Sequence, residues 1–123
     1  MKIRPFILSE TNWLDISNRD FDVAVLPWGA TEPHNYHLPY VTDTMQVSYI
    51  AEKSGELAWN KGSKVIVLPA VPWGANAGQI DLKLCLHINP STQMILLNDI
   101  VENLKRFGIS KLVIINGHGG NDF

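Results

Sequence analysis

Two acidic residues and two histidines lie close together in this chain, and side chains of these types can bind a metal ion. Glu32, His34, His37 and Asp43 fall within twelve consecutive residues. Pro33 disfavours a helical conformation at Glu32 and favours an extended course. Residues two apart in an extended segment point the same way, so Glu32 and His34 could reach one site together.

A second stretch of this kind, residues 116–122, reads Asn-Gly-His-Gly-Gly-Asn-Asp. His118 would lie just beyond an apolar strand, between glycines that let the backbone approach a ligand closely. Carboxylates and imidazoles together suit zinc, manganese or iron(II). The candidate metal ligands are therefore Glu32, His34, Asp43 and His118.

Each candidate also has an ordinary role to weigh against ligation. Glu32 could be a solvated loop acid, and His34 a loop histidine bonded to the backbone. Asp43 would lie in the first turn of a helix, where the helix dipole stabilises an acid in any case. His118 could be a structural histidine at a strand end. Proximity in the sequence favours ligation for the first three, and the flanking glycines and the place at the carboxyl edge of the sheet favour it for His118. His37 is more typical of a residue that orients the loop or supports a ligand.

The elements that must position these residues are three apolar strands and two long helices. Continuous apolar runs without alternation are typical of strands buried on both faces. The strand–helix–strand–helix–strand order predicts an α/β fold with a mainly parallel sheet and right-handed crossovers. We expect strands at 22–27, 64–69 and 111–116, long helices at 44–60 and 91–107, and a short helix at 11–18.

Residues typical of helix starts and ends, together with the spacing of apolar residues, define the two long helices. Thr42 and Ser91 are expected to cap their starts, and Gly62 and Gly108 to mark their ends. Apolar residues recur at helical spacing in both segments. They are Met45, Tyr49 and Ile50 in the first helix, and Leu97, Ile100, Val101 and Leu104 in the second.

Parallel α/β sheets bind ligands beyond the carboxyl ends of their strands. Here the loops that begin near residues 27, 69 and 116 are rich in Gly, Pro, Trp, His, Asn or acids. The topology therefore indicates that the site lies at this edge of the sheet, where both groups of candidate ligands meet.

Composition narrows the function classes. The 123 residues suit a single α/β domain, and a net charge of −2 provides no basic patch for nucleic acid or an anionic membrane. Cys85 is the single cysteine, which excludes an intrachain disulfide, and we expect it to be a small core residue. No signal-peptide pattern follows the N-terminus, and no apolar run approaches the roughly 20 residues that span a bilayer. We expect a cytoplasmic protein.

Two motifs resemble a known family. Gly-Ala-Thr-Glu-x-His-x-x-His-Leu-Pro at 29–39, followed by Thr-Asp at 42–43, resembles the signature of the creatininase (creatinine amidohydrolase) family. The Asn-Gly-His-Gly-Gly-Asn at 116–121, after a Val-Ile-Ile strand, is also similar. The match runs from about residue 26 to the end and is weaker between 69 and 90. The resemblance implies a three-layer α/β/α fold, of which residues 1–123 are an N-terminal portion roughly half the length of a family domain.

The resemblance also implies a site and an activity. Two divalent ions, Zn, Mn or Fe, would share Asp43; Glu32 and His118 would complete one ion's protein ligands, and His34 would serve the other. The expected activity is metal-dependent hydrolysis of a non-peptide C–N bond, a cyclic amide or formamide, by metal-activated water. The substrate would be a small-molecule amide, and the protein a homo-oligomer, often a hexamer in this family.

One departure concerns the ligand set. Creatininases carry an acid two residues after the histidine of the Gly-His dipeptide, and Gly120 occupies that place. This disfavours creatinine as substrate, and the family pattern gives the nearby Asp122 no ligand role. Residues that could support the site or line its pocket are His37, Gly119, Gly120 and Asn121.

Other interpretations stay open. The chain could be a catalytically inactive creatininase-like scaffold or a truncated fragment. It could also be a nucleotide-binding α/β module, because glycines after a strand can cradle phosphate, although Asp122 replaces the last glycine of the dinucleotide fingerprint. His87 is expected to have an ordinary polar role. Four aromatic residues could line either a pocket or a subunit interface: Trp28, Tyr36, Tyr40 and Trp73.

Overall fold

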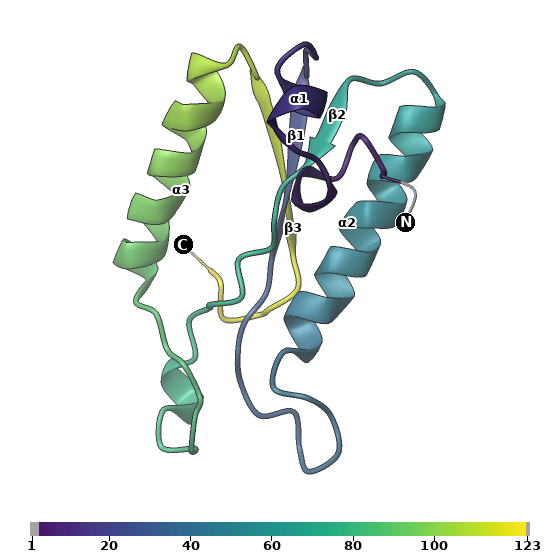
Figure 1. Ribbon diagram of the computed structural model, residues 1–123. Coiled ribbons are helices and arrows are strands. Elements are labelled where there is room, and N and C mark those ends of the chain that lie inside the picture. Colours follow the sequence, from purple (N-terminus) through teal and green to yellow (C-terminus); the bar gives the residue numbers. More distant parts are fainter. Residues whose placement is uncertain (1–2, 123) are drawn as a thin grey trace.

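A sheet of parallel strands lies between two long helices in the computed structural model, which describes residues 3–122 (Figure 1). Helix α2 covers one face of the sheet and α3 the other, so the predicted three-layer α/β architecture is confirmed. The elements are η1 (Leu8–Glu10), α1 (Trp13–Ile16), β1 (Val23–Trp28), α2 (Thr42–Asn60), β2 (Val65–Val67), η2 (Ala77–Gln79), α3 (Pro90–Arg106) and β3 (Lys111–Asn116).

Strand β1 is the centre of the sheet, whose order is β2-β1-β3. Val25 packs towards α2 with Ala51, whereas Ala24 packs with Leu104 of α3. This alternation places apolar side chains on both faces, as expected for a strand without polar alternation. All three strands run the same way, so their carboxyl ends lie at one edge, where the loops with the candidate ligands begin.

Strands β2 and β3 differ from their predicted form. β2 ends at Val67 rather than at Pro69, and its outer side pairs with Ile7 instead of another long strand. β3 was expected to be buried on both faces, but Val113 and Ile114 are 49% and 42% exposed. The reason is position: β3 is an edge strand, and no strand within residues 3–122 pairs with its outer side.

Helix α2 packs on the sheet through small residues rather than through its larger apolar ones. Val47, Ala51 and Gly55 are buried, whereas Met45 and Tyr49 are exposed, as is Ile50. A Cβ atom at Gly55 would lie 2.6 Å from Val67 Cγ2, so the small residue lets the helix approach the sheet closely.

The helix ends were predicted better than the helix starts. Gly62 and Gly108 follow the ends of α2 and α3 with φ of 86° and 76°. Thr42 is the first residue of α2 and not its cap; its hydroxyl donates to the Pro39 carbonyl. α3 begins at Pro90, ahead of Ser91, because proline suits the first helical position, where its missing N–H costs nothing. None of the helices in the described part of the chain could span a membrane.

Candidate metal centre

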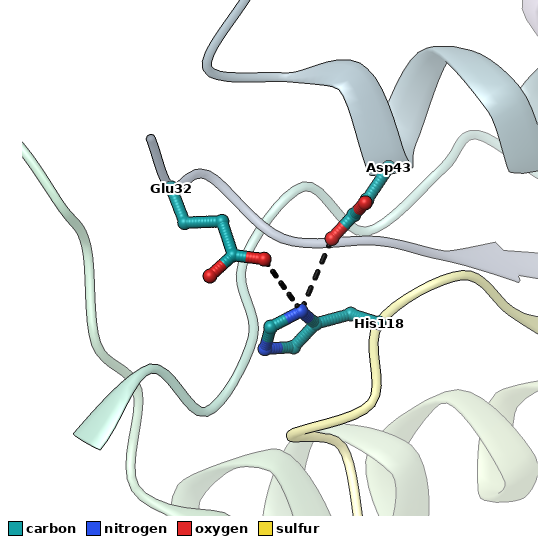
Figure 2. A group of neighbouring side chains, drawn as sticks. All are labelled: Glu32, Asp43 and His118. Atoms are coloured by element: carbon teal, nitrogen blue, oxygen red, sulfur yellow. Dashed lines mark hydrogen bonds and ion pairs between the residues drawn. The ribbon is translucent and has the colours of Figure 1, made fainter. Parts of the chain in front are cut away.

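Residues from three different segments meet around one point beyond the carboxyl ends of β1 and β3 (Figure 2). Glu32 comes from the loop after β1, Asp43 from the first turn of α2 and His118 from the loop after β3. His118 Nδ1 lies 2.9 Å from Glu32 Oε1 and 3.1 Å from Asp43 Oδ2. One possible ligand atom from each residue lies within 4.8 Å of the other two.

His34 completes the cluster from the other side of Asp43. Its Nε2 lies 2.8 Å from Asp43 Oδ1 and 3.9 Å from Glu32 Oε1. Glu32 and His34 therefore reach one site together, in agreement with the extended course predicted around Pro33. The Asp43 carboxylate presents one oxygen to each histidine.

Two glycines allow the strand ends to reach the start of α2. A Cβ atom on Gly117 would lie 2.4 Å from Val47 Cγ1 and 3.1 Å from the Asp43 carbonyl oxygen. A Cβ on Gly29 would lie 2.4 Å from Thr44 Oγ1. Any larger residue at either position would push α2 away from the sheet edge, and with it the Asp43 carboxylate.

Backbone carbonyls fix the orientation of both histidine rings. His118 Nε2 lies 3.0 Å from the Ala75 carbonyl oxygen, and His34 Nδ1 lies 3.1 Å from that of Glu32. A carbonyl oxygen only accepts, so these two nitrogens carry the ring N–H. The opposite nitrogen of each ring then faces carboxylate oxygens, which requires positive charge, as a second ring proton or as a cation. This arrangement is typical of histidines that bind metal.

Burial makes the need for positive charge stronger. Glu32 and Asp43 are each 7% exposed, and a buried carboxylate is costly unless it is paired. Burial, the largest influence on His34, lowers its pKa, but the bond to Asp43, the Glu32 carbonyl and both acidic charges outweigh it and raise the pKa above the ordinary value. Without a metal, the cluster therefore favours a proton on His34.

Gln79 joins the cluster although no sequence pattern pointed to it. Its Nε2 donates to Glu32 Oε2 at 2.5 Å, from the short helix η2. A neutral amide in the segment where the family resemblance is weakest carries no signal of spacing or charge. Only the three-dimensional contact between its amide and Glu32 identifies Gln79 as part of the site.

Two of the predicted supporting residues shape the site. A Cβ on Gly120 would lie 2.0 Å from the Ala75 carbonyl oxygen and 2.6 Å from His118 Nε2, so this backbone has no room for a side chain there. Asn121 Oδ1 accepts from the Ala75 N–H, and its Nδ2 donates to the Gly29 carbonyl, both at 3.1 Å. Asn121 thus connects the loops that follow β1, β2 and β3.

Other predicted residues lie away from the cluster. His37 and Gly119 are exposed, and among residues 3–122 neither has a hydrogen bond or ion pair to the four candidate ligands. His87 has the polar role expected, since its Nδ1 accepts from the Asn76 N–H at 2.9 Å. Cys85 is partly exposed in a loop, so its predicted place in the core is wrong.

The four aromatic residues expected to line a pocket or a subunit interface lie partly in the core and partly on the surface. Trp28 is buried and donates from Nε1 to the Trp73 carbonyl, whereas Tyr36 and the Trp73 side chain are exposed. Tyr40 is also exposed, and its hydroxyl donates to the Lys83 carbonyl.

The geometry can be compared with known proteins. The sequence profile of the family described as creatinine amidohydrolase matches residues 9–123. The chain belongs to the creatininase family. The resemblance seen in the two motifs is thereby confirmed over nearly the whole chain.

This creatininase-family chain is similar to several solved structures and to one relative of known function. It is 45% identical to a Bacteroides fragilis NCTC 9343 protein provisionally assigned as a creatinine amidohydrolase, with a TM-score of 0.92 over 100% of this chain and 49% of that one. It is 25% identical to a creatinine amidohydrolase (creatininase), with a TM-score of 0.80 over 95% of this chain and 46% of the other. The mycofactocin precursor peptide peptidase of Mycolicibacterium smegmatis is 29% identical over 100 residues, which are 80% of this chain and 40% of the peptidase. The chain thus spans about half the length of the structures it matches.

Proposed function

We propose that this protein is a metal-dependent hydrolase that cleaves the C–N bond of an amide, with Glu32, His34, Asp43 and His118 as metal ligands. One observation carries the proposal. Both histidines have one ring nitrogen bonded to a backbone carbonyl, and their other nitrogens converge on two buried carboxylates. Divalent cations bound between these groups would satisfy all four.

The donor set fits zinc, manganese or iron(II), because it combines carboxylate oxygens with imidazole nitrogens. The fold is also shared with a structure described as creatininase Mn and with a mutant creatininase of Zn-Zn type. Asp43 has an oxygen 2.8 Å from His34 Nε2 and another 3.1 Å from His118 Nδ1. A carboxylate so placed can be shared, which supports two ions per site.

Bound ions of this type would lower the pKa of water and polarise an amide carbonyl. The chain's own residues do the positioning. The Glu32 and Ala75 carbonyls hold the two imidazoles in the ligating tautomer, and Asn121 holds the Ala75 segment against the loop after β1. Burial of Glu32 and Asp43 keeps water from screening their charge.

For the substrate, we propose a small non-peptide amide, a cyclic amide or a formamide. Gly120 disfavours creatinine, because creatininases carry an acid at this position and the Ala75 carbonyl leaves no room for one here. A peptide amide is a second candidate, favoured by the similarity to a peptidase that acts on a precursor peptide. Assays of the full-length protein with creatinine, a formamide, a cyclic amide and a peptide distinguish these substrates.

Metal analysis tests the ligand assignment. The full-length protein and its Glu32→Ala and His118→Ala variants would be dialysed against zinc or manganese, and their metal content measured by plasma mass spectrometry. We expect both variants to lose most of the metal, whereas the control His87→Ala, whose ring bonds to Asn76 and Asn89, retains it. Equal metal in the parent and in both ligand variants would refute the assignment.

The alternatives predict other outcomes. An inactive scaffold would fold and assemble but cleave none of the four amides. A nucleotide-binding module would be stabilised against heat by a nucleotide and not by manganese or zinc. We also propose that the protein self-associates, which the exposed apolar side chains on α2 support; they are Met45, Tyr49, Ile50 and Leu57.

A further inference from the structure

The two oxygens of the Glu32 carboxylate have different partners. Oε1 lies 2.9 Å from His118 Nδ1, on the side of the candidate ligands. Oε2 accepts a hydrogen bond from Gln79 Nε2 at 2.5 Å, on the other side. The carboxylate is therefore held so that one oxygen faces the site and the other is occupied.

From this contact we infer that Gln79 is a positioning residue, which orients Glu32 so that it offers a single oxygen to a metal ion. The inference rests on the proposed function, because it concerns a ligand of the same site. A glutamate has several rotatable bonds, and an unrestrained one loses rotamer freedom when it binds. A partner that holds it in place before the metal arrives reduces that cost.

Gln79 is itself well anchored. Its backbone N–H donates to the Asn76 carbonyl at 3.0 Å. Asn76 is buried, and its Nδ2 donates to the Leu86 carbonyl at 2.8 Å. The Leu86 N–H in turn donates to the Thr31 carbonyl at 3.0 Å, one residue before Glu32. A short chain of hydrogen bonds thus connects Gln79 back to the loop that carries its partner.

The chemistry of the side chain suits this role. A primary amide donates a hydrogen bond to a carboxylate without cancelling its charge, so Glu32 stays an anionic ligand. A lysine in the same place would pair with the carboxylate and oppose the cation. Groups that hold metal ligands in this way contribute about 10–100-fold to metal affinity when they are tested by mutation.

The rival explanation is that Gln79 only stabilises the loop. Replacing it by methionine separates the two roles, because methionine keeps the length of the side chain and removes the donor. The matched control is Gln46→Met, the same chemical change at an exposed position of α2. Zinc affinity of the full-length, metal-stripped proteins would be measured by competition with a chelating dye, and their urea midpoints in EDTA would be compared.

We expect the zinc dissociation constant of Gln79→Met to rise about 10–100-fold, with a urea midpoint in EDTA close to that of the parent. Gln46→Met should match the parent in both measurements. With cobalt(II) as a coloured substitute, freeing the second Glu32 oxygen should raise the coordination number and weaken the visible absorption. Gln79→Glu, which sets a like charge against Glu32, should weaken zinc binding at least as much.

Three other results would contradict the role proposed for Gln79. If the parent and Gln46→Met bind zinc and Gln79→Met binds it equally well, the role of Gln79 is refuted and the ligand assignment stands. If affinity and EDTA stability fall together in both Gln79 variants, the residue is structural and the inference is wrong. If the parent itself binds no metal, the proposed function fails and this inference fails with it.

Discussion

Replacing Asp43 by asparagine should have opposite effects on the stability of the metal-free protein and on its affinity for metal. The change keeps the shape of the side chain and removes its charge. The asparagine amide can donate to one of the two facing nitrogens, and its oxygen can accept from the other when that ring is protonated. What is lost is the charge that a cation needs.

The magnitude follows from the spacing of the carboxylates. The ligand atoms of Glu32 and Asp43 lie within 4.8 Å of each other. Two unit charges at this separation repel by about 3 kcal/mol at an effective dielectric constant of about 20. Their side chains are only 9% and 11% exposed, so water screens the repulsion weakly. Asp43→Asn should therefore stabilise the metal-free protein by about 1–3 kcal/mol when both histidines are neutral.

The sign of the effect depends on pH through His34. Its pKa is raised in the folded protein, with burial opposing and the Asp43 bond favouring the charged ring. The stability that this pair contributes is fully present below the unfolded value of about 6.5, and it is lost as pH rises through the folded pKa. Asp43 therefore stabilises the fold in acid, where Asp43→Asn should be destabilising. The gain should appear only at alkaline pH.

Urea unfolding at pH 8.5 and pH 5.5, in EDTA and in excess zinc, measures all of these quantities. Zinc at 100 times its dissociation constant should stabilise the parent by about 2.7 kcal/mol and the variant by much less. Asn103→Asp is a control, because it changes charge on the exposed surface of α3. If Asp43→Asn is less stable than the parent in EDTA at pH 8.5, or gains as much from zinc, the account of the site as facing, uncompensated carboxylates is wrong.

Three further predictions follow from the same structure. Gly120→Ala should cost about 1–3 kcal/mol of unfolding free energy and weaken zinc binding, because its Cβ would lie 2.0 Å from a backbone carbonyl oxygen. The control Gly119→Ala, whose Cβ would enter open space, should cost little. Equal urea midpoints for the two variants would contradict the predicted overlap. Burial and then the charge of Glu32 raise the pKa of the Cys85 thiol above its ordinary value of 9.0. Iodoacetamide should therefore label this thiol slowly at pH 8 and faster as the pH rises. Labelling as fast as that of a cysteine in an unstructured peptide would show that the thiol is not shielded. We propose that the protein self-associates through the exposed apolar face of α2, so Tyr49→Lys should lower the particle mass measured by light scattering. An unchanged mass would exclude this face as the subunit contact.

Much of the fold could be predicted because the pattern of the chain is local and strong. The apolar runs at 22–27 and 111–116 correspond closely to β1 and β3, and Gly62 and Gly108 mark the helix ends. The helix starts were less predictable, since Thr42 and Ser91 have the right side chains for caps but are the first and the second residue of their helices. The burial of β3 could not be predicted, because it depends on which strand takes the edge.

The same division applies to the site. Glu32, His34 and Asp43 could be grouped because a short extended segment and a helix start bring them together, and His118 because the parallel sheet places its strand end beside theirs. Gln79 could not be found, because its contact with Glu32 depends on the course of a loop without regular periodicity.

Gly120 shows how one departure from the family pattern can be understood physically. Where creatininases have an acid, this chain has a residue whose missing side chain leaves room for the Ala75 carbonyl to approach His118 Nε2 to 3.0 Å. That carbonyl fixes the ring so that Nδ1 faces Glu32 and Asp43. In this backbone, an acid at position 120 and the carbonyl that fixes the His118 ring therefore exclude each other. It follows that restoring an acid here should do more than add a ligand: it should also displace the carbonyl that orients His118.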